Sequence, residues 1–512
     1  MIVLFNRRNK YLLIILILLS ASLIYGQKKS EEGFIGKADL YRAKKHALDY
    51  LSDSMIIRKF GIISDSIWSY AELGMQEFKS SVILMKTLEE EGFIVEKDIA
   101  GMPTCFIATW GKGKPVIGVL GEFDALPMIS QKALTPVQDP IIKGAPGHGC
   151  GHNMMGTAGV AAAVAVKKSM ELNNIQGTIK FFGSPAEETI ISRPYMVKAG
   201  VFKDVDAVID NHASSDFSTS YGVDGNAVIS AVFTFRGKTA HAASAPWSGR
   251  SALDGVELMD IATNYLREHI NTNARIHYVI SEGGEAPNVV PDEASVWYYI
   301  RNTDENLEDM FKRVMDCAKG AALASGTTLD SVRIITAIHQ KHSSKGMAET
   351  IRKNIELVGM PEWTENEQVF AKSLQKELGG KETGYPVKIN PWKEPDAKPG
   401  GASTDVGEVS LITPTATLNF PGEVPGAIGH HWSTVTAGYG NAAWKGLNAG
   451  ARVIAATALD LLTNSKLLGE IKTEFAEYSK AHPYKSFLPE GTKPPLDLNK
   501  DIMEKYQNIN IK

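Results

Sequence analysis

The sequence predicts an α/β protein in which a large domain is interrupted by a smaller ferredoxin-like unit. Three apolar runs, at 115–120, 177–183 and 205–211, have the length of buried strands, and helical segments alternate with strands along this part of the chain. Polar residues follow the ends of these runs, which is typical of parallel sheets with a ligand site at their carboxyl edge. The segment 224–344 instead follows the order strand, helix, strand, strand, helix, strand, which is a complete ferredoxin-like unit.

The first part of the large domain, residues 40–223, begins with helices. Ile57, Phe60 and Ile67 recur at helical spacing, and Gly92 ends the second helix. The expected elements here are helices at 40–78, 80–91 and 154–170 and strands at 93–95, 105–110, 115–120, 177–183 and 205–211.

The inserted unit is expected to divide the large domain into residues 40–223 and 345–477. Its expected strands lie at 228–236, 275–284, 293–301 and 331–340, and its helices lie at 251–270 and 304–325. The alternating patterns of the strands and the amphipathic pattern of the second helix support this assignment. After the insertion we expect a helix at 347–357, an alanine-rich closing helix at 442–463 and an extended, proline-containing tail at 478–512.

Residues 1–26 are expected to form a signal peptide rather than part of the fold. The basic group Arg7-Arg8-Asn9-Lys10 precedes an apolar run at 11–25, which is short for a membrane span. We predict cleavage near Gly26, so that the body of the protein is exported, either periplasmic or secreted. The alternative is an uncleaved anchor, because Ile24 stands where small residues are commoner. In both cases the membrane is contacted only through this segment.

Size and composition exclude several classes of protein. With 512 residues, 44% hydrophobic and 22% charged, the chain is long enough for roughly two to three globular domains. Its net charge of −4 and the lack of a long basic run in the body argue against nucleic acid as a partner. The three cysteines are Cys105, Cys150 and Cys317, and we predict no disulfide among them.

The segment Gly147–Asn153, with the sequence GHGCGHN, is the strongest candidate for a metal site. It places the Cys150 thiol and the His152 imidazole two residues apart, and both groups suit Zn²⁺ or a similar divalent ion. The surrounding glycines let the backbone turn tightly enough for both side chains to face one point. A Cys-x-His pair alone is weak evidence, but carboxylates and further histidines follow it along the chain.

Glu187 and Glu188 follow the strand at 177–183, in a loop where adjacent side chains point in different directions. One carboxylate could bind a metal while the other accepts a proton from a metal-activated water. His212 ends the next strand, and the pair His430-His431 lies in a loop rich in Gly and Pro. Each of these places could supply a metal ligand, and the spacing does not decide between the two adjacent histidines.

Other polar residues have more ordinary interpretations. Asp124 could orient a metal-binding side chain without binding the metal itself, since such side chains usually require a partner of this kind. Glu122 could do the same or have no role. A lone histidine after a strand, such as His241, is more often structural. Serine chemistry at Ser214 or Ser244 is disfavoured because no Gly-x-Ser-x-Gly elbow surrounds either residue.

Together these motifs resemble the metal-dependent amidohydrolase branch of the aminoacylase/carboxypeptidase metallopeptidases, which includes hippurate hydrolases and auxin-conjugate hydrolases. Within that branch the pattern is most similar to the large-subunit type of p-aminobenzoyl-glutamate hydrolase, from about Ile57 to Pro495. The motifs that carry the resemblance are Gly121–Pro127, Gly147–Asn153, Pro185–Glu188, Asn288–Asp292, Ser403–Ser410 and Gly429–Trp432.

The resemblance implies a site with two divalent metal ions, Zn or Mn. The implied metal ligands are Cys150, His152, Glu188, His212 and His430. His430 fits the family's pattern better than His431 does. Glu187 would be the general base that takes a proton from the metal-bound water and thereby provides a hydroxide.

The resemblance also implies that two chains pair through the inserted unit, which would act as a lid and dimerisation domain. His241 would then polarise the substrate carbonyl in the partner's site. Asn288 and Arg301 would hold the substrate's carboxylate. A homodimer is expected, with a related second subunit as the alternative.

The implied function is metal-dependent hydrolysis of the amide bond of N-acyl or N-aroyl amino acids, or of small peptides. A dipeptidase or carboxypeptidase of the same superfamily is one alternative, and it is disfavoured by Cys150, where that branch tends to use Asp. A non-catalytic binding protein on the same fold is another, and it is disfavoured by the intact Glu187 and ligand set.

Overall fold

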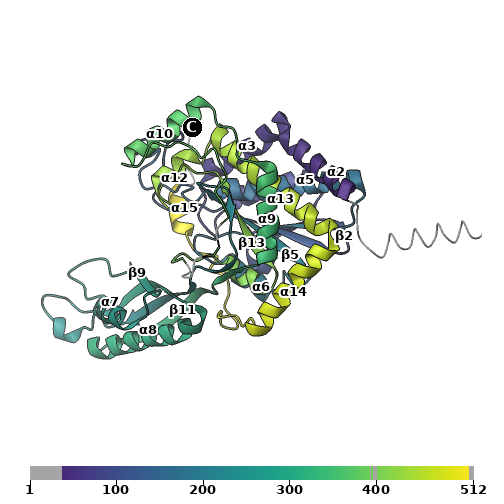
Figure 1. The fold of residues 1–512 in the computed structure, drawn as a ribbon. Helices are drawn as coiled ribbons and strands as arrows, with labels where there is room; N and C mark the ends of the chain where they lie inside the picture. Colours follow the sequence, from purple (N-terminus) through teal and green to yellow (C-terminus); the bar gives the residue numbers. More distant parts are fainter. Residues whose placement is uncertain (1–36, 393, 396–399, 507–512) are drawn as a thin grey trace, which may run out of the picture.

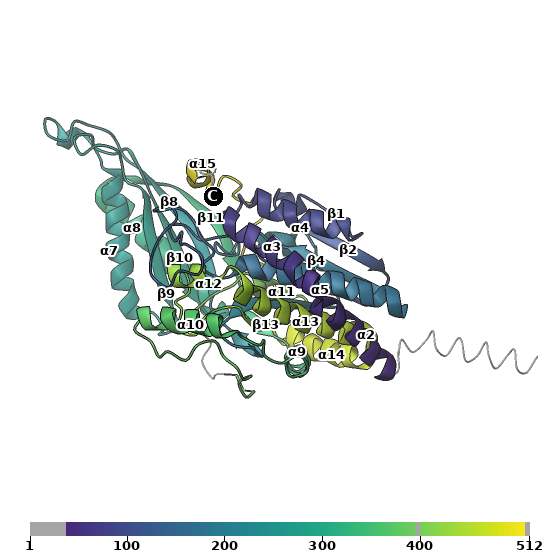
Figure 2. The same ribbon diagram turned by 90° about the horizontal axis from the view of Figure 1, so that it is seen from above.

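The computed structural model describes residues 37–392, 394–395 and 400–506, and these form two units (Figures 1 and 2). The larger unit is a seven-stranded sheet covered by helices on both faces, and the smaller unit is a four-stranded sheet with two helices on one face. The signal peptide or anchor expected at 1–26 lies outside the described residues. Among the helices that the structure describes, none is long and apolar enough to span a membrane.

The larger sheet is mixed, with four adjacent parallel strands at its centre. Its strand order is β1 (Ile94–Glu96), β2 (Phe106–Lys112), β4 (Gly177–Gly183), β3 (Val116–Gly121), β5 (Ala207–Ser214), β13 (Thr415–Pro421) and β6 (Ser218–Thr219). The strands β4, β3, β5 and β13 run parallel, β2 and β6 join them antiparallel, and β1 pairs antiparallel with β2. β3 is buried along its whole length, as expected for a strand covered on both faces. The α/β class predicted from the sequence is confirmed.

Helices cover both faces of this sheet, and each face has its own core. Ile117 and Val119 of β3 belong to one core, whereas Val116 and Leu120 belong to the other. The first face is covered by α2 (Lys37–Ser52), α3 (Ser54–Tyr70), α4 (Phe78–Glu90), α5 (His152–Asn173), α9 (Lys345–Val358), α13 (Asn441–Thr463) and α14 (Ser465–Ala481). The second face is covered by α6 (Ser192–Lys198), α11 (Val406–Ser410) and part of the C-terminal segment. Connecting segments contain α10 (Glu365–Glu377), α12 (Trp432–Ala437) and the 3-10 turns η1 (Ile99–Gly101), η2 (Pro246–Ser248) and η3 (Arg267–His269).

Helix α5 packs closely on this sheet because its residues are small. A methyl group on Gly156 would come within 2.6 Å of the Glu122 carbonyl oxygen, and one on Gly159 would come within 2.7 Å of the Phe181 ring. The helix therefore lies almost directly on the backbone that follows β3. This close approach brings the first residue of α5, His152, to the edge of the sheet where β3 ends.

A fully buried arginine joins the helices of the second face to the end of β3. Arg193 of α6 lies 2.7 Å from the Glu122 carboxylate through Nη2 and pairs with Asp405 Oδ1 through Nη1. The other oxygen of Asp405 accepts a hydrogen bond from the Arg193 backbone amide at 3.0 Å. Burial lowers the pKa of Arg193, but the charges of Asp405 and Glu122 outweigh this effect and raise it, so the guanidinium stays charged.

The smaller unit follows the order β8 (Ala227–Arg236), α7 (Ala252–Leu266), β9 (Arg275–Glu282), β10 (Glu293–Asn302), α8 (Asp304–Ser325) and β11 (Thr328–Ile338). Its strands pair antiparallel in the order β11-β8-β10-β9, and both helices lie on the same face (Figure 2). This is the β-α-β-β-α-β order expected for the inserted unit. At its base, β7 (Gly222–Asp224) pairs antiparallel with β12 (Lys341–Ser343), so two strands link it to the larger unit.

The prediction of an extended tail at 478–512 is wrong for part of this segment. Helix α14 continues to Ala481, and another helix, α15 (Lys500–Tyr506), follows the proline-containing stretch. Met503 of α15 packs in a small cluster with Ala71, Leu73 and Ala125. A contact with residues so distant in sequence stabilises α15, and no local pattern reveals it.

Replacing Arg193 by Met is expected to lower the free energy of unfolding by about 3–5 kcal/mol, because it leaves two buried carboxylates without their cation. Urea denaturation followed by circular dichroism measures the change. Lys45→Met is the control, since it removes an exposed ion pair with Asp49 whose side chains are 57% and 60% exposed, and little change is expected from such a pair. Equal stability of the Arg193 variant and the wild type would contradict this account of the buried charges.

Candidate metal centre

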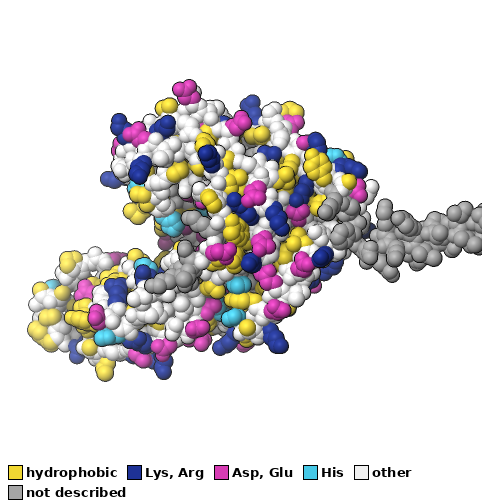
Figure 3. All heavy atoms as spheres, viewed as in Figure 1, with side chains coloured by type: hydrophobic (Ala, Val, Ile, Leu, Met, Phe, Trp, Pro, Cys, Tyr) yellow, Lys and Arg dark blue, Asp and Glu magenta, His cyan; other side chains and the backbone are white. Residues whose placement is uncertain are grey.

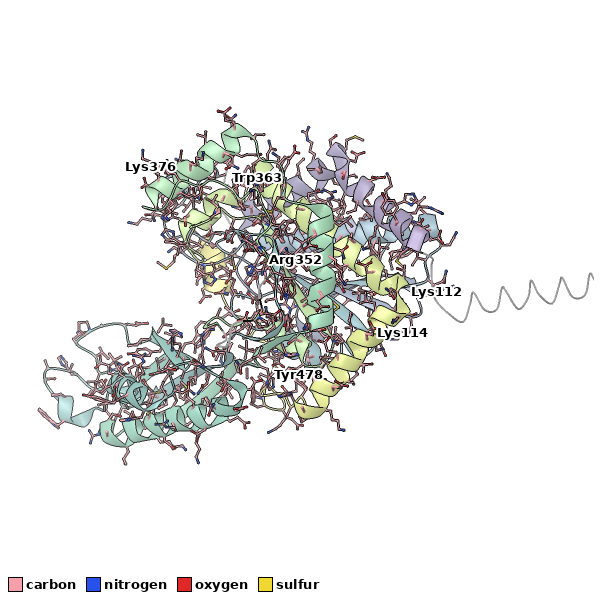
Figure 4. All side chains as sticks on the ribbon, in the orientation of Figure 1. Lys112, Lys114, Arg352, Trp363, Lys376 and Tyr478 are labelled. Atoms are coloured by element: carbon pink, nitrogen blue, oxygen red, sulfur yellow. The ribbon has the colours of Figure 1, made fainter. Side chains whose placement is uncertain are left out.

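The candidate site lies where the parallel strands end. β3, β4, β5 and β13 all have their carboxyl ends at the edge of the sheet that faces the smaller unit. Lys112 and Lys114, close to the start of β3, mark the opposite edge in Figure 4. A cavity of about 560 Å³ lies between the carboxyl edge and the smaller unit. Figure 3 shows the surface hollowed between the two units, with histidine side chains bordering the hollow.

His152 and Asp124 form the buried base of the site. The Nδ1 of His152 donates a hydrogen bond to Asp124 Oδ1 at 2.8 Å, and the Nε2 lies 3.3 Å from Glu122 Oε2. This is the geometry that a carboxylate needs to orient a metal-binding imidazole. Burial lowers the pKa of His152, but the neighbouring groups Cys150, Glu188 and Asp124 raise it well above its ordinary value.

Cys150 and His212 lie together at the end of β5. Cys150 Sγ is 3.4 Å from His212 Nε2, and His212 Nδ1 donates to the Ala213 carbonyl oxygen at 2.5 Å. Gly151 has a φ angle of +80°, and a Cβ at this position would lie 2.6 Å from the Ala213 Cβ. Only glycine therefore lets the chain turn between the thiol and His152 while β5 passes so close.

Glu188 approaches two histidines. Its Oε2 lies 3.3 Å from His430 Nε2, and its Oε1 lies 3.9 Å from His152 Nε2. The adjacent His431 instead caps helix α12, where its ring accepts a hydrogen bond from the Ser433 amide at 3.4 Å. The structure therefore brings His430, and not His431, to the group of candidate ligands.

The described residues contain groups that could each hold a metal ion, and two of these groups share Cys150. The groups are Cys150 with His152 and His212, Cys150 with Glu188 and His430, and Glu122 with His152 and Glu187; within each, the ligand atoms lie within 4.8 Å of one another. Glu122 Oε2, His152 Nε2 and Glu188 Oε1 are buried and have no hydrogen-bond partner among the described residues. Thiolate, imidazole and carboxylate groups with unused lone pairs are what a divalent transition-metal ion requires, so the residues present fit such ions.

Glu187 lies beside these ligands without belonging to either group that contains Cys150. Its Oε2 is 3.7 Å from His152 Nε2, and its side chain lines the cavity. Burial, followed by the charge of Glu122, raises the pKa of Glu187 well above its ordinary value, and burial raises the pKa of Glu188 to about 8. Both shifts arise mainly from burial, which disfavours the charged carboxylates, and bound cations would offset this effect.

Glu122, whose role the sequence left open, is held by Arg193 at 2.7 Å. The guanidinium neutralises part of the acidic cluster and keeps Glu122 beside His152. Sequence analysis assigned no role to Arg193, and it included Asp405 only as part of the motif Ser403–Ser410 without a role of its own, because no local pattern distinguishes a buried charge from an exposed one. The signal appears only in the fold, where these two residues meet although they are 212 positions apart.

The cavity is also bordered by basic side chains from the smaller unit and from a linking strand. It is lined by Arg275 and His277 of β9, Tyr299 and Arg301 of β10, and Lys341 of β12. The Arg301 guanidinium lies 5.3 Å from the centre of the Tyr299 ring, and Lys341 Nζ donates to Thr417 Oγ1 at 3.2 Å. The family resemblance predicted Arg301. The other cations were missed because they become neighbours only when the smaller sheet lies against the larger one.

His241 and Asn288 lie together but away from this cavity. Both are exposed, at the end of the smaller sheet remote from the linking strands β7 and β12. There the Ala242 amide donates to the Asn288 carbonyl oxygen at 3.0 Å, and His241 pairs with Val289 in an isolated bridge. Neither residue lines the cavity, so a single chain does not bring these two predicted residues to the metal ligands.

Comparison with known proteins gives the family of this fold and site. The model of peptidase family M20/M25/M40 matches residues 118–431. A p-aminobenzoyl-glutamate hydrolase subunit of Escherichia coli (strain K12) is 37% identical over 464 residues, which cover 85% of this chain and 96% of that protein. The Xaa-Arg dipeptidase of Mus musculus is 28% identical over 463 residues, which cover 88% of this chain and 96% of that protein.

A solved structure shows the same architecture. The aminobenzoyl-glutamate utilization protein from Klebsiella pneumoniae superposes with a TM-score of 0.56 at 16% identity, over 81% of this chain and 98% of that one. The family match and the 37% identical relative confirm the resemblance that the motifs indicated. The chain therefore belongs to peptidase family M20/M25/M40 and is an enzyme that hydrolyses amide bonds.

Proposed function

We propose that this protein hydrolyses the amide bond of N-acyl or N-aroyl amino acids whose amino-acid part is anionic, with p-aminobenzoyl-glutamate as the representative substrate. The observation that carries the proposal is the composition of the 560 Å³ cavity. Its lining contains the two candidate metal groups that share Cys150 together with Arg275, Arg301 and Lys341. A substrate bound in the cavity would place its amide at the metal groups and its carboxylates at these cations.

The chemistry assigned to this chain divides between ligands and a base. The residues that would hold two divalent ions, Zn or Mn, are Cys150, His152, Glu188, His212 and His430. When bound, such ions supply Lewis-acid activation of water and of the amide carbonyl. Glu187 accepts the proton that the attacking water loses and returns a proton to the amine as the C–N bond breaks. Asp124 keeps His152 in place through the 2.8 Å bond to Nδ1.

The names of the relatives suggest two kinds of substrate, and the charge of the cavity distinguishes between them. The amino-acid part of p-aminobenzoyl-glutamate is anionic, whereas that of an Xaa-Arg dipeptide carries a guanidinium. Arg275, Arg301 and Lys341 line the same cavity as the candidate metal ligands. Asp210 and Asp224 also line the cavity, but both already accept hydrogen bonds from protein groups. Apart from the acidic residues at the candidate metal site, these three cations outnumber the two aspartates in the lining, which favours an anionic amino acid.

The position of His241 and Asn288 supports a proposal about assembly. If two copies of the chain, or this chain and a related second subunit, associate through the smaller unit, these residues can reach the partner's cavity. The Escherichia coli relative is itself named as a subunit of its hydrolase. We also propose that the protein is exported by means of the segment 1–26, which places its substrates outside the cytoplasm.

With Zn²⁺ or Mn²⁺ supplied, the protein is expected to hydrolyse p-aminobenzoyl-glutamate with a kcat/KM at least about tenfold higher than that for p-aminobenzoyl-arginine. The two compounds differ only in the amino acid, and one charge-assisted contact is worth about tenfold or more. Chromatography of released p-aminobenzoate measures both rates. Glu187→Gln keeps the candidate metal ligands and serves as the control, with kcat reduced about 10²-fold or more. A preference for the arginine compound would contradict the proposed substrate, and a normal kcat in Glu187→Gln would contradict the proposed base.

Mixed dimers test whether His241 acts across the interface. Glu187→Gln and His241→Ala are each expected to have little activity alone. After subunit exchange, a mixed dimer has one site with both defects and one site with neither, so activity should return toward half the wild-type level per mixed dimer. Native mass spectrometry of chains with different tags verifies the exchange. If chains exchange and no activity returns, His241 serves its own chain or takes no part in the reaction.

A further inference from the structure

The turn that carries Glu187 and Glu188 is held at both sides of Glu187 by buried carboxylates. The backbone amide of Glu188 donates to Asp124 Oδ2 at 3.0 Å, and the amide of Ala186 donates to Glu77 Oε1 at 2.7 Å. Asp124 belongs to the metal site through His152, but Glu77 neither lines the cavity nor belongs to a candidate metal group of the described chain. The function proposed above gives Glu77 no role.

The backbone at Ala186 needs such support because its conformation is unfavourable. Ala186 has a φ angle of +55°, in the left-handed region that residues other than glycine rarely adopt. A strained residue of this kind persists only where its surroundings determine its conformation. Here the loop between α3 and α4 does so, since a Cβ on Gly74 would lie 2.9 Å from the Ala186 Cα.

The Glu77 side chain is itself firmly placed. It is fully buried, and its second oxygen accepts a hydrogen bond from Thr104 Oγ1 at 3.0 Å. Both carboxylate oxygens are therefore used in holding protein groups. Buried carboxylates that accept hydrogen bonds in this way fix backbone geometry, and their removal leaves a buried amide unsatisfied.

We propose that Glu77 is a positioning residue: through the Ala186 amide it fixes the direction in which Glu187 presents its carboxylate to the reacting water. The proposal rests on the proposed function, in which Glu187 is the general base. Asp124 and Glu77 then act as a pair, one on each side of Glu187. Losing Glu77 should leave the metal ligands in place, because the Glu188 amide keeps its bond to Asp124, and should displace Glu187.

The test compares Glu77→Ala and Glu77→Gln with the same substitutions at Glu408. Glu408 is a matched control because it is also fully buried and also accepts one backbone amide, that of His339 at 2.9 Å, and one hydroxyl, that of Tyr484 at 2.5 Å. Its partners do not belong to the turn at 184–188. Each variant is measured for Tm, for metal content, for kcat and KM on p-aminobenzoyl-glutamate, and for hydrogen–deuterium exchange of peptides covering 184–188.

Glu77→Ala is expected to lower kcat by about 10- to 100-fold, as a displaced catalytic group does, with KM and metal content close to wild type and faster exchange at 184–188. Glu77→Gln should restore most of kcat, because its amide oxygen can accept from Ala186 while its nitrogen donates to Thr104. Glu408→Ala should lower Tm to a similar extent without these effects.

Unchanged exchange at 184–188 in Glu77→Ala would overturn the proposal, as would an equal loss of kcat in Glu77→Ala and Glu408→Ala. Glu77→Gln as inactive as Glu77→Ala would also overturn it, because the carboxylate charge and not the hydrogen bond would then matter. If the wild type hydrolyses no acyl amino acid, the proposed function fails, while the exchange measurement still tests the contact between Glu77 and the turn.

Discussion

Four carboxylates buried together at one edge of a sheet impose the constraint on which this site depends. The side chains of Glu122, Asp124, Glu187 and Glu188 are at most 12% exposed. Bringing like charges into such a place costs several kcal/mol for each group unless cations and hydrogen bonds offset it. The protein offsets part of this cost with Arg193 and with the imidazole and amides around the cluster. Some lone pairs of the carboxylates and the imidazole still have no partner among the described residues. These lone pairs point toward common positions, as they do in a metal site.

The smaller unit supplies the opposite charge. Its strands β9 and β10 place Arg275 and Arg301 in the lining of the cavity at the acidic edge, and the paired strands β7 and β12 fix its connection to the larger unit. In the proposed function, two tasks are divided between two folding patterns. Bond cleavage belongs to the ends of parallel strands, where side chains from distant segments converge. Recognition of the amino acid would belong to Arg275 and Arg301 of the antiparallel sheet.

Much of the fold could be predicted because its signals are local. The bounds expected for β4, 177–183, and for α8, 304–325, are those of the structure, and the β-α-β-β-α-β order is contained in one continuous segment. Of the candidate site, only residues that stand in motifs or at the ends of strands could be predicted. Arg193, Glu77 and helix α15 could not, because each depends on contacts that only the folded chain creates: Glu77 meets Ala186 across 109 positions. A charged residue gives no sign in the sequence that its partner lies so far along the chain.

A crystal structure of the protein loaded with Zn²⁺, with anomalous diffraction recorded at the zinc edge, tests the central claim most directly. The account predicts two anomalous peaks at the carboxyl edge of the larger sheet, roughly 3.5–4 Å apart. Cys150 Sγ should lie within bonding distance of both ions, about 2.3 Å, with His152 and His212 near one ion and Glu188 and His430 near the other. A single ion, or a pair of ions that Cys150 does not touch, would contradict it.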